Sequence, residues 1–111
     1  MGGLVKGDVV VLPFPFSDLS ASKKRPALVI APLPAYSDVI LCMITSRSAR
    51  DDRAVPISRM DFVTGDLPRD SNVRPNRLFT ADASIILRTA GRLTTSKIDD
   101  VVAEIIEIIS A

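Results

Sequence analysis

The chain has 111 residues, of which 47% are apolar and 24% charged, and its formal net charge is +1. This length suffices for one domain with its own core, so we expect residues 1–111 to form a single domain. The absence of histidine and the presence of one cysteine exclude imidazole-based nucleophilic catalysis and an intramolecular disulfide, and disfavour a zinc site. No apolar run approaches the roughly 18 residues that span a membrane, and Met1–Lys6 lacks a signal-peptide pattern. We therefore expect no membrane association and a cytoplasmic location.

The first half of the chain reads as β-structure. Three segments rich in β-branched and other apolar residues are predicted strands: Val9–Pro13, Arg25–Ala31 and Asp38–Thr45. The last is an almost continuous apolar run, which is typical of a strand buried on both faces. Pro13 and Pro15 flank Phe14, which indicates an edge or an irregular path at that point.

The second half adds shorter strands. The pattern predicts Ala54–Ile57, a strand over Ser71–Thr80 that is interrupted at Pro75, and Arg88–Leu93. Thr64-Gly65-Asp66 is a turn signal, and Asp82–Leu87 is expected to be extended or a single helical turn.

The last residues change period. Apolar residues recur at helical spacing from Ile98 to Ile109, with acidic residues near the start and on the other side. Ser96 followed by Asp99 resembles a capping box, which predicts Ser96 as the N-cap. The sequence thus predicts a mainly β fold: a compact barrel of about five to seven short strands, followed by a C-terminal helix.

Three polar clusters sit at strand boundaries. In the first, Lys23 and Lys24 lead into Arg25, which begins a strand and is well placed to hold a phosphate. The alternative is an ordinary solvated loop. In the second, Thr45 and Ser46 follow a buried strand, where hydroxyls donate to a phosphate or simply terminate the strand by bonding its backbone.

The third cluster is Arg74-Pro75-Asn76-Arg77. Two arginines three residues apart around a Pro-Asn turn are suited to grip a nucleic-acid strand, or they decorate the surface. Phe14 and Phe16 have a similar ambiguity between stacking on bases and filling the core.

Gly7-Asp8-Val9-Val10, the strand from Lys24 to Ile30 and Ile44-Thr45-Ser46, in this order and spacing, resemble the MazF/PemK family of toxins from bacterial type II toxin–antitoxin systems. Asp70–Arg74, Gly91–Leu93 and the final helix also match the layout, so the resemblance covers nearly the whole chain. It implies an SH3-like small β-barrel of the MazF/PemK/CcdB type. It also implies a homodimer that cleaves single-stranded RNA at short sequences, without a metal or another cofactor.

The resemblance also implies site residues. The catalytic arginine of the family corresponds to Arg25, and its threonine corresponds to Thr45 with Ser46 adjacent. Some PemK-like members use an Arg-x-Asp pair, for which this chain has Arg74 but Asn76 in place of the acid. Such members also carry a histidine in the first loop, which is absent here, so the arginine–threonine version of the mechanism is expected.

In that mechanism the 2′-hydroxyl of the RNA is the nucleophile. Arg25 would stabilise the negative charge that develops on the phosphate, and Thr45 would donate a hydrogen bond to it. Asp18 is the candidate general base. The further RNA contacts are expected from polar residues of the three clusters: Ser17, Lys23, Lys24, Ser46, Arg47, Arg74, Asn76 and Arg77.

Two other functions remain open from the sequence. One is a non-enzymatic toxin of the same barrel that inhibits a protein target such as DNA gyrase, although the chain ends in Ile108–Ala111 without an aromatic residue. The other is a degenerate homologue that only binds RNA or an antitoxin. The expected partner is a cognate antitoxin that lays an acidic, partly disordered segment across the basic cleft, in a complex that binds DNA.

Overall fold

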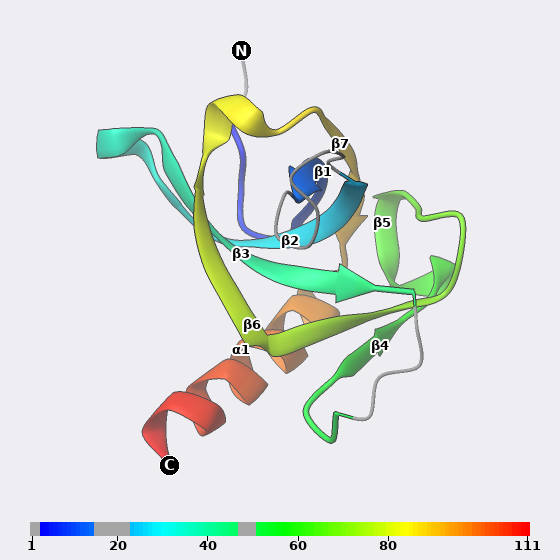
Figure 1. The fold of residues 1–111 in the computed structure, drawn as a ribbon. Coiled ribbons are helices and arrows are strands. Elements are labelled where there is room, and N and C mark those ends of the chain that lie inside the picture. The colour runs from blue at the N-terminus through cyan, green and yellow to red at the C-terminus, as the bar shows by residue number, and fades with distance from the viewer. Residues whose placement is uncertain (1–2, 15–22, 47–50) are drawn as a thin grey trace.

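A computed structural model of the chain describes residues 3–14, 23–46 and 51–111. Its strands are β1 (Asp8–Phe14), β2 (Lys23–Leu33), β3 (Asp38–Thr45), β4 (Val55–Ile57), β5 (Phe62–Gly65), β6 (Ser71–Asp82) and β7 (Arg88–Leu93). Three short 3-10 turns, η1 (Pro34–Tyr36), η2 (Arg59–Asp61) and η3 (Ala83–Ile85), connect strands, and the helix α1 spans Thr95–Ser110. Figure 1 shows the helix at the end of a chain that is otherwise mostly β-strand.

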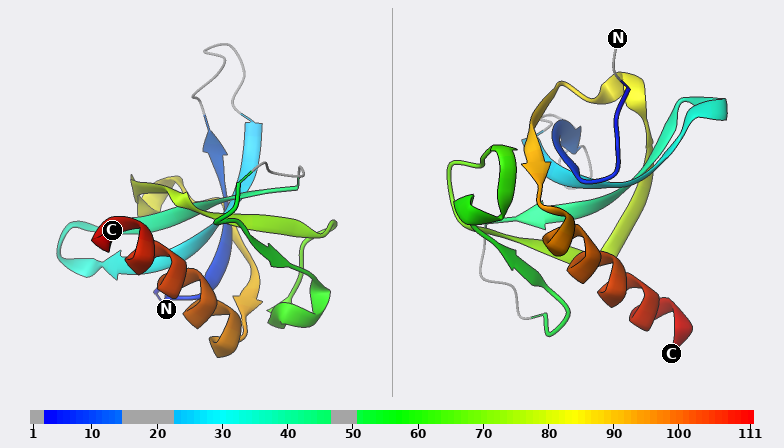
Figure 2. Two further views of the ribbon diagram at one scale, coloured as in Figure 1. Left: turned by 90° about the horizontal axis from the view of Figure 1, so that it is seen from below. Right: turned by 180° about the vertical axis from the view of Figure 1, so that it is seen from behind.

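The seven strands form one antiparallel sheet in the order β4-β6-β3-β2-β1-β7-β5. The sheet curls into a half-barrel, and α1 lies across one side of it (Figures 1 and 2). The expected architecture, a small β-barrel with a C-terminal helix, is therefore confirmed.

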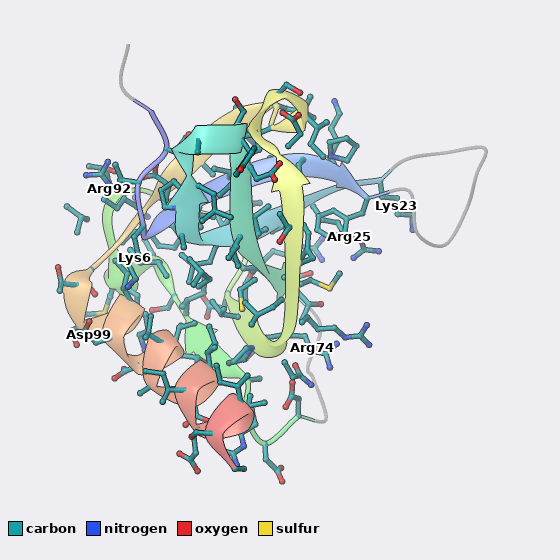
Figure 3. All side chains as sticks on the ribbon, turned by 90° about the vertical axis from the view of Figure 1, so that its left-hand side faces the viewer. Lys6, Lys23, Arg25, Arg74, Arg92 and Asp99 are labelled. Atoms are coloured by element: carbon teal, nitrogen blue, oxygen red, sulfur yellow. The ribbon has the colours of Figure 1, made fainter. Side chains whose placement is uncertain are left out.

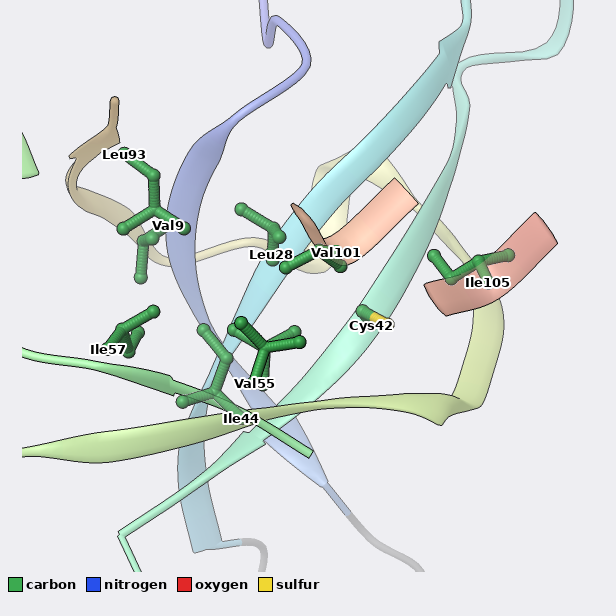
Figure 4. Packing of buried hydrophobic residues seen from close by; sticks show 10 residues of the cluster. Val9, Leu28, Cys42, Ile44, Val55, Ile57, Leu93, Val101 and Ile105 are labelled. Carbon is green, nitrogen blue, oxygen red and sulfur yellow. The ribbon is translucent and has the colours of Figure 1, made fainter. Parts of the chain in front are cut away.

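Apolar residues are buried on both faces of the sheet. On one face, here called the helix face, Val101 and Ile105 of α1 pack with strand residues that include Val9, Leu28 and Cys42 (Figure 4). The other face, here called the opposite face, holds a second core. Its fully or nearly buried members are Val10, Leu12, Phe14, Ala27, Val29, Val39 and Leu41. A strand between two cores must be apolar at consecutive positions, which explains the continuous apolar run of β3.

The long strand β6 is interrupted by a bulge in its pairing with β3. Its first residues pair with the end of β3 at Ile44↔Val73, and its later residues pair from Cys42↔Leu78 onward. The four residues from Arg74 to Arg77 form the irregularity between these two pairings. Pro75, which cannot donate to a ladder, lies within this bulge, so the predicted interruption is confirmed in position.

Pro13 lies in an inner strand, but at this position the strand has a neighbouring strand on one side only. β1 pairs with β7 only from Asp8 to Val11, whereas its pairing with β2 continues to Phe14. Pro13 is therefore a local edge, as the two prolines indicated. Phe14 is buried and meets Phe79 edge to face, with ring centroids 5.2 Å apart, so the core interpretation of Phe14 is confirmed.

The expectation of a bare turn at Thr64-Gly65-Asp66 was incomplete. Phe62–Gly65 is a strand that pairs only with β7, and Gly65, with φ of +65°, is its last residue. A four-residue strand that depends on one distant partner carries no local pattern of its own.

The predicted N-cap of α1 was wrong. The cap is Thr94, whose Oγ1 accepts a hydrogen bond from the Lys97 backbone N–H at 3.3 Å, so Ser96 lies inside the helix. The Thr94 backbone N–H donates to the Asp61 carbonyl oxygen at 2.8 Å, which fixes the cap against η2. A tertiary contact thus selects between two hydroxyl residues that are equally good caps in isolation.

Candidate functional site

Arg25 and Thr45 lie at the same end of two neighbouring strands. The ladder between β2 and β3 includes Leu28↔Cys42 and Ala27↔Met43 and stops there. Arg25 and Thr45 each lie two residues beyond this last pair, at the same end of the two strands. Because alternate residues of a strand share a face, both side chains leave the sheet on the face of Ala27 and Met43.

The neighbours of this pair extend it into a row across four strands. Arg25 is paired with Leu12 of β1, and Thr45 is paired with Asn72 of β6. Leu12 belongs to the core of the opposite face, so Arg25, Thr45 and Asn72 are on that face as well. The sheet thus presents a guanidinium, a hydroxyl and an amide in one line.

A cavity of about 560 Å³ opens where β2 and β3 part. Arg25 and Thr45 both line it, and its volume is typical of small-molecule and nucleotide sites. The other polar lining residues are cations and hydroxyls: Lys24, Ser46, Arg69, Ser71 and Arg88. None of the described residues that line it is acidic, so this part of the cavity is electrostatically suited to an anion.

The arginines of the described residues divide into two groups. Arg53, Arg59, Arg74 and Arg92 each lie within salt-bridge distance of a carboxylate. Across residues 3–14, 23–46 and 51–111, Arg25, Arg69 and Arg88 have no such partner, and all three line the cavity. Arg77 also has no carboxylate partner among the described residues but lines a different cavity, so three of the four unpaired guanidinium groups line this one.

The third predicted cluster lies elsewhere. Arg74 Nε is 3.3 Å from Asp51 Oδ2, and the Asp51 side chain is only 7% exposed. Arg77 lines a separate cavity of about 260 Å³ together with Phe14 and Phe79, and Asn76 is exposed. Figure 3 shows Arg74 on the same side of the molecule as Lys23 and Arg25, with Lys6 and Arg92 on the other side. The residues of this cluster therefore do not line the cavity of Arg25 and Thr45, although Arg74 lies on the same side of the molecule as Arg25.

Several predicted residues fall outside the described ranges. Ser17, Asp18 and Arg47 are among them, as is Phe16. Of the remaining predicted contacts, Lys24 and Ser46 line the cavity, and Lys23 is exposed at the start of β2.

Sequence reasoning missed Arg69, Ser71 and Arg88. Arg69 belongs to a polar segment between β5 and β6, and Arg88 begins a strand that is not part of any charged cluster. Nothing in their local pattern distinguishes them from surface residues. The sheet order could have found Arg88, because β7 is the strand beside β1 and Arg88 pairs with Val11.

Charged pairs hold the segment before β4 in place. Arg53 lies 3.3 Å from Glu104 and 2.8 Å from Glu107 of α1, and these partners raise the pKa of its guanidinium, Glu107 more than Glu104. Asp51, two residues earlier, contacts Arg74 of β6. The segment therefore ties the helix to the bulge of β6.

The one cysteine is not a nucleophile. Cys42 is fully buried, its Sγ–H donates to the Arg74 carbonyl oxygen at 3.2 Å, and burial raises the pKa of its thiol to about 12. Within the described ranges, no group of three or more His, Cys, Asp or Glu side chains could hold a metal ion. The same residues include no helix with the length and apolar character that crossing a membrane requires.

The fold and the cavity define a small β half-barrel protein with a cavity lined by cations and hydroxyls at the end of its sheet. The family model described as "PemK-like, MazF-like toxin of type II toxin-antitoxin system" matches residues 5–109. The chain therefore belongs to the PemK-like, MazF-like toxin family, which confirms the resemblance read from its motifs. A sequence search of curated proteins finds no match.

Solved structures share this fold at low sequence identity. An endoribonuclease in complex with its cognate antitoxin, from a mycobacterial species, is 13% identical, with a TM-score of 0.77 over 97% of this chain and 96% of that chain. The MazE–MazF complex of Deinococcus radiodurans in crystal form III is 19% identical, with a TM-score of 0.76 over 96% of each chain. The Mycobacterium tuberculosis toxin MazF-mt6 is 18% identical, with a TM-score of 0.73 over 93% of this chain and 96% of that chain.

Proposed function

We propose that this toxin is a metal-independent, sequence-selective endoribonuclease that cleaves single-stranded RNA. The observation that carries the proposal is that Arg25 and Thr45, from the same end of two neighbouring strands, both line a cavity whose described lining residues include no acid. The names of two similar structures, both endoribonucleases from mycobacterial species, support the same activity.

The proposed reaction needs no nucleophile from the protein. The 2′-oxygen of the RNA attacks the adjacent phosphorus as its proton leaves to a base, and the bond from phosphorus to the 5′-oxygen breaks. The products are a 2′,3′-cyclic phosphate and a 5′-hydroxyl end, which takes up a proton. Asp18 is the proposed base.

Arg25 and Thr45 have separate roles in this reaction. Arg25 has no carboxylate partner within the described ranges, so its full charge is available to the pentacoordinate phosphate. Thr45 donates its hydroxyl hydrogen to a non-bridging oxygen. Removal of one such transition-state donor typically lowers kcat about 100- to 1000-fold.

The test is to incubate the purified protein with a mixed RNA in the presence of EDTA and to map the cut ends. We expect cuts at one short sequence, with 5′-hydroxyl products, and loss of cleavage for Arg25→Ala with the fold intact. Arg59→Ala is the matched control, since the Arg59 side chain is 86% exposed and does not line the cavity. Normal cleavage by Arg25→Ala, or cleavage that EDTA abolishes, would contradict the proposal.

The cavity and the similar structures also suggest which molecules this toxin binds. We propose a homodimer in the cytoplasm and a cognate antitoxin whose acidic segment occupies the basic cavity, which is the cleft expected to bind RNA. The complexes named among the similar structures, an endoribonuclease with its antitoxin and MazE–MazF, support this. Light scattering of the purified toxin, alone and mixed with a small acidic protein encoded by the neighbouring gene, measures both associations. Ser17, Lys23, Ser46, Arg47, Arg74, Asn76 and Arg77 remain proposed RNA contacts.

A further inference from the structure

Arg25 and Arg88 leave the sheet on different faces. Along β2, Ala27 and Val29 pack on the opposite face and Leu28 on the helix face, so Arg25 shares the first face and Lys24 the second. Val11 of β1 pairs with Pro26 on one side and with Arg88 on the other, so Arg88 also belongs to the helix face. Lys24 and Arg88 are therefore separated from the Arg25–Thr45 pair by the backbone of the sheet, although all four residues line the cavity.

Backbone contacts hold the segments that carry Arg88 and Arg69 in position. The Leu87 N–H donates to the Val11 carbonyl oxygen at 2.8 Å, which fixes the chain directly before Arg88. The buried Ser71 hydroxyl donates to the Arg69 carbonyl oxygen at 3.0 Å and anchors the segment that carries Arg69. These cations thus extend from ordered backbone at the wall of the cavity, with their side chains exposed.

The charge of this group is not compensated by the described part of the chain. Arg69, Arg88 and Lys24 have no salt bridge within it, and none of its residues that line their cavity is acidic. Four of the arginines among the described residues have a carboxylate beside them and four do not, and three of the unpaired ones, Arg25, Arg69 and Arg88, line this cavity. Like charges around one cavity repel each other, and a bound anion relieves that repulsion.

We propose that Lys24, Arg69 and Arg88 form a second phosphate-binding site, which holds the backbone phosphate of a nucleotide next to the cleavage position. The inference rests on the proposed function and adds a role that the Arg25–Thr45 pair does not have. These three residues bind and position the RNA strand, whereas Arg25 and Thr45 contact the reacting phosphate. The toxin would therefore engage at least two consecutive phosphates, one on each face of the sheet end.

The test measures binding separately from cleavage. A fluorescein-labelled, mixed-sequence single-stranded DNA is a suitable probe, because it has the phosphates but lacks the 2′-hydroxyl that the reaction needs. Its affinity is measured by anisotropy at several salt concentrations for the wild type, Arg69→Ala, Arg88→Ala and the double variant. Each lost phosphate contact lowers the slope of log affinity against log salt by about 0.7, so we expect a reduction of about 1.4 in the double variant.

Kinetics on RNA distinguish a binding role from a catalytic one. We expect Arg69→Ala and Arg88→Ala to raise KM and leave kcat unchanged, and Arg25→Ala to lower kcat. Arg59→Ala, with an equally exposed guanidinium outside the cavity, controls for the loss of one positive charge. Circular dichroism of each variant checks that the fold is retained.

Three results would overturn the inference. The first is a salt slope for Arg69→Ala and Arg88→Ala equal to that of Arg59→Ala, and the second is a loss of kcat as large as that of Arg25→Ala. The third is an unchanged slope together with lost binding of a poly-glutamate peptide, which would assign the site to an acidic protein partner. If the wild type cleaves no RNA but the slopes fall as expected, the second site stands and the proposed endoribonuclease activity fails.

Discussion

Replacing Arg74 with alanine should destabilise the fold. Arg74 Nε lies 3.3 Å from Asp51 Oδ2, and the two side chains are 23% and 7% exposed, respectively. Removal of the guanidinium leaves the Asp51 carboxylate largely excluded from water without its cation. The Asp51 carboxylate keeps one hydrogen bond, from the Arg53 backbone N–H to Oδ1 at 2.9 Å, so the loss is partial.

The expected cost is about 2 kcal/mol, within the range of roughly 1–3 kcal/mol for leaving a buried polar partner unsatisfied. The entropy of unfolding of a chain this long is about 0.23 kcal/mol/K, so the melting temperature should fall by about 9 °C. Thermal unfolding followed by circular dichroism at one fixed protein concentration measures the change, since a dimer would make the midpoint depend on concentration.

Arg77→Ala is the matched control, because Arg77 lies in the same bulge with an exposed side chain. It should change the free energy of unfolding by no more than about 0.5 kcal/mol. A double-mutant cycle of Asp51→Ala and Arg74→Ala should give a coupling energy of about 1 kcal/mol or more. A wild-type melting temperature for Arg74→Ala, with weakened RNA binding, would refute the structural role and favour the RNA contact predicted from the sequence.

Three further changes test other parts of the fold. Thr94→Ala removes the helix cap and should cost about 1 kcal/mol, or about 4 °C in melting temperature, whereas Ser96→Ala should be neutral; equal effects would refute the assigned cap. Cys42 should resist iodoacetamide at neutral pH in the native state and react in denaturant. Burial raises the pKa of the Cys42 thiol from 9.0 to about 12, so ionisation of this thiol should lower the free energy of unfolding only as the pH rises above 9. Rapid alkylation of the native protein at neutral pH would contradict the predicted resistance of Cys42. Gly91→Ala would bring a Cβ against the Thr64 carbonyl oxygen and the Phe62 ring, and should cost about 1–3 kcal/mol by separating β5 from β7, as measured by urea unfolding; an unchanged midpoint would show that the contact yields.

The elements with strong local patterns were predictable. The strand Asp38–Thr45 has the bounds that its apolar run indicated, and the bulge in β6 falls at Pro75. The exceptions depend on contacts between distant segments. Phe62–Gly65 is a strand because β7 lies beside it, and Thr94 is the N-cap because its backbone bonds to Asp61.

The residues that line the cavity also differ in whether the local sequence indicated them. Arg25 and Thr45 were predicted from motifs that resemble the family, and both line the cavity. Arg69 and Arg88 were not predicted, because only the curl of the sheet brings them to the same cavity. The pairing of Arg74 with Asp51 was also hidden, since the two residues are separated by 23 positions and neither has a distinctive neighbour.

The outer strands of the sheet limit how copies of the toxin can associate. β4 has three residues with Pro56 at its centre, and β5 has four and ends in a glycine with positive φ. A proline has no N–H to offer, and strands this short present few unpaired backbone groups to another chain. Extension of the sheet from one molecule into the next is thereby discouraged at both edges. We therefore expect association between toxin molecules to use side chains of exposed surfaces, and β-aggregation through these two strands is disfavoured.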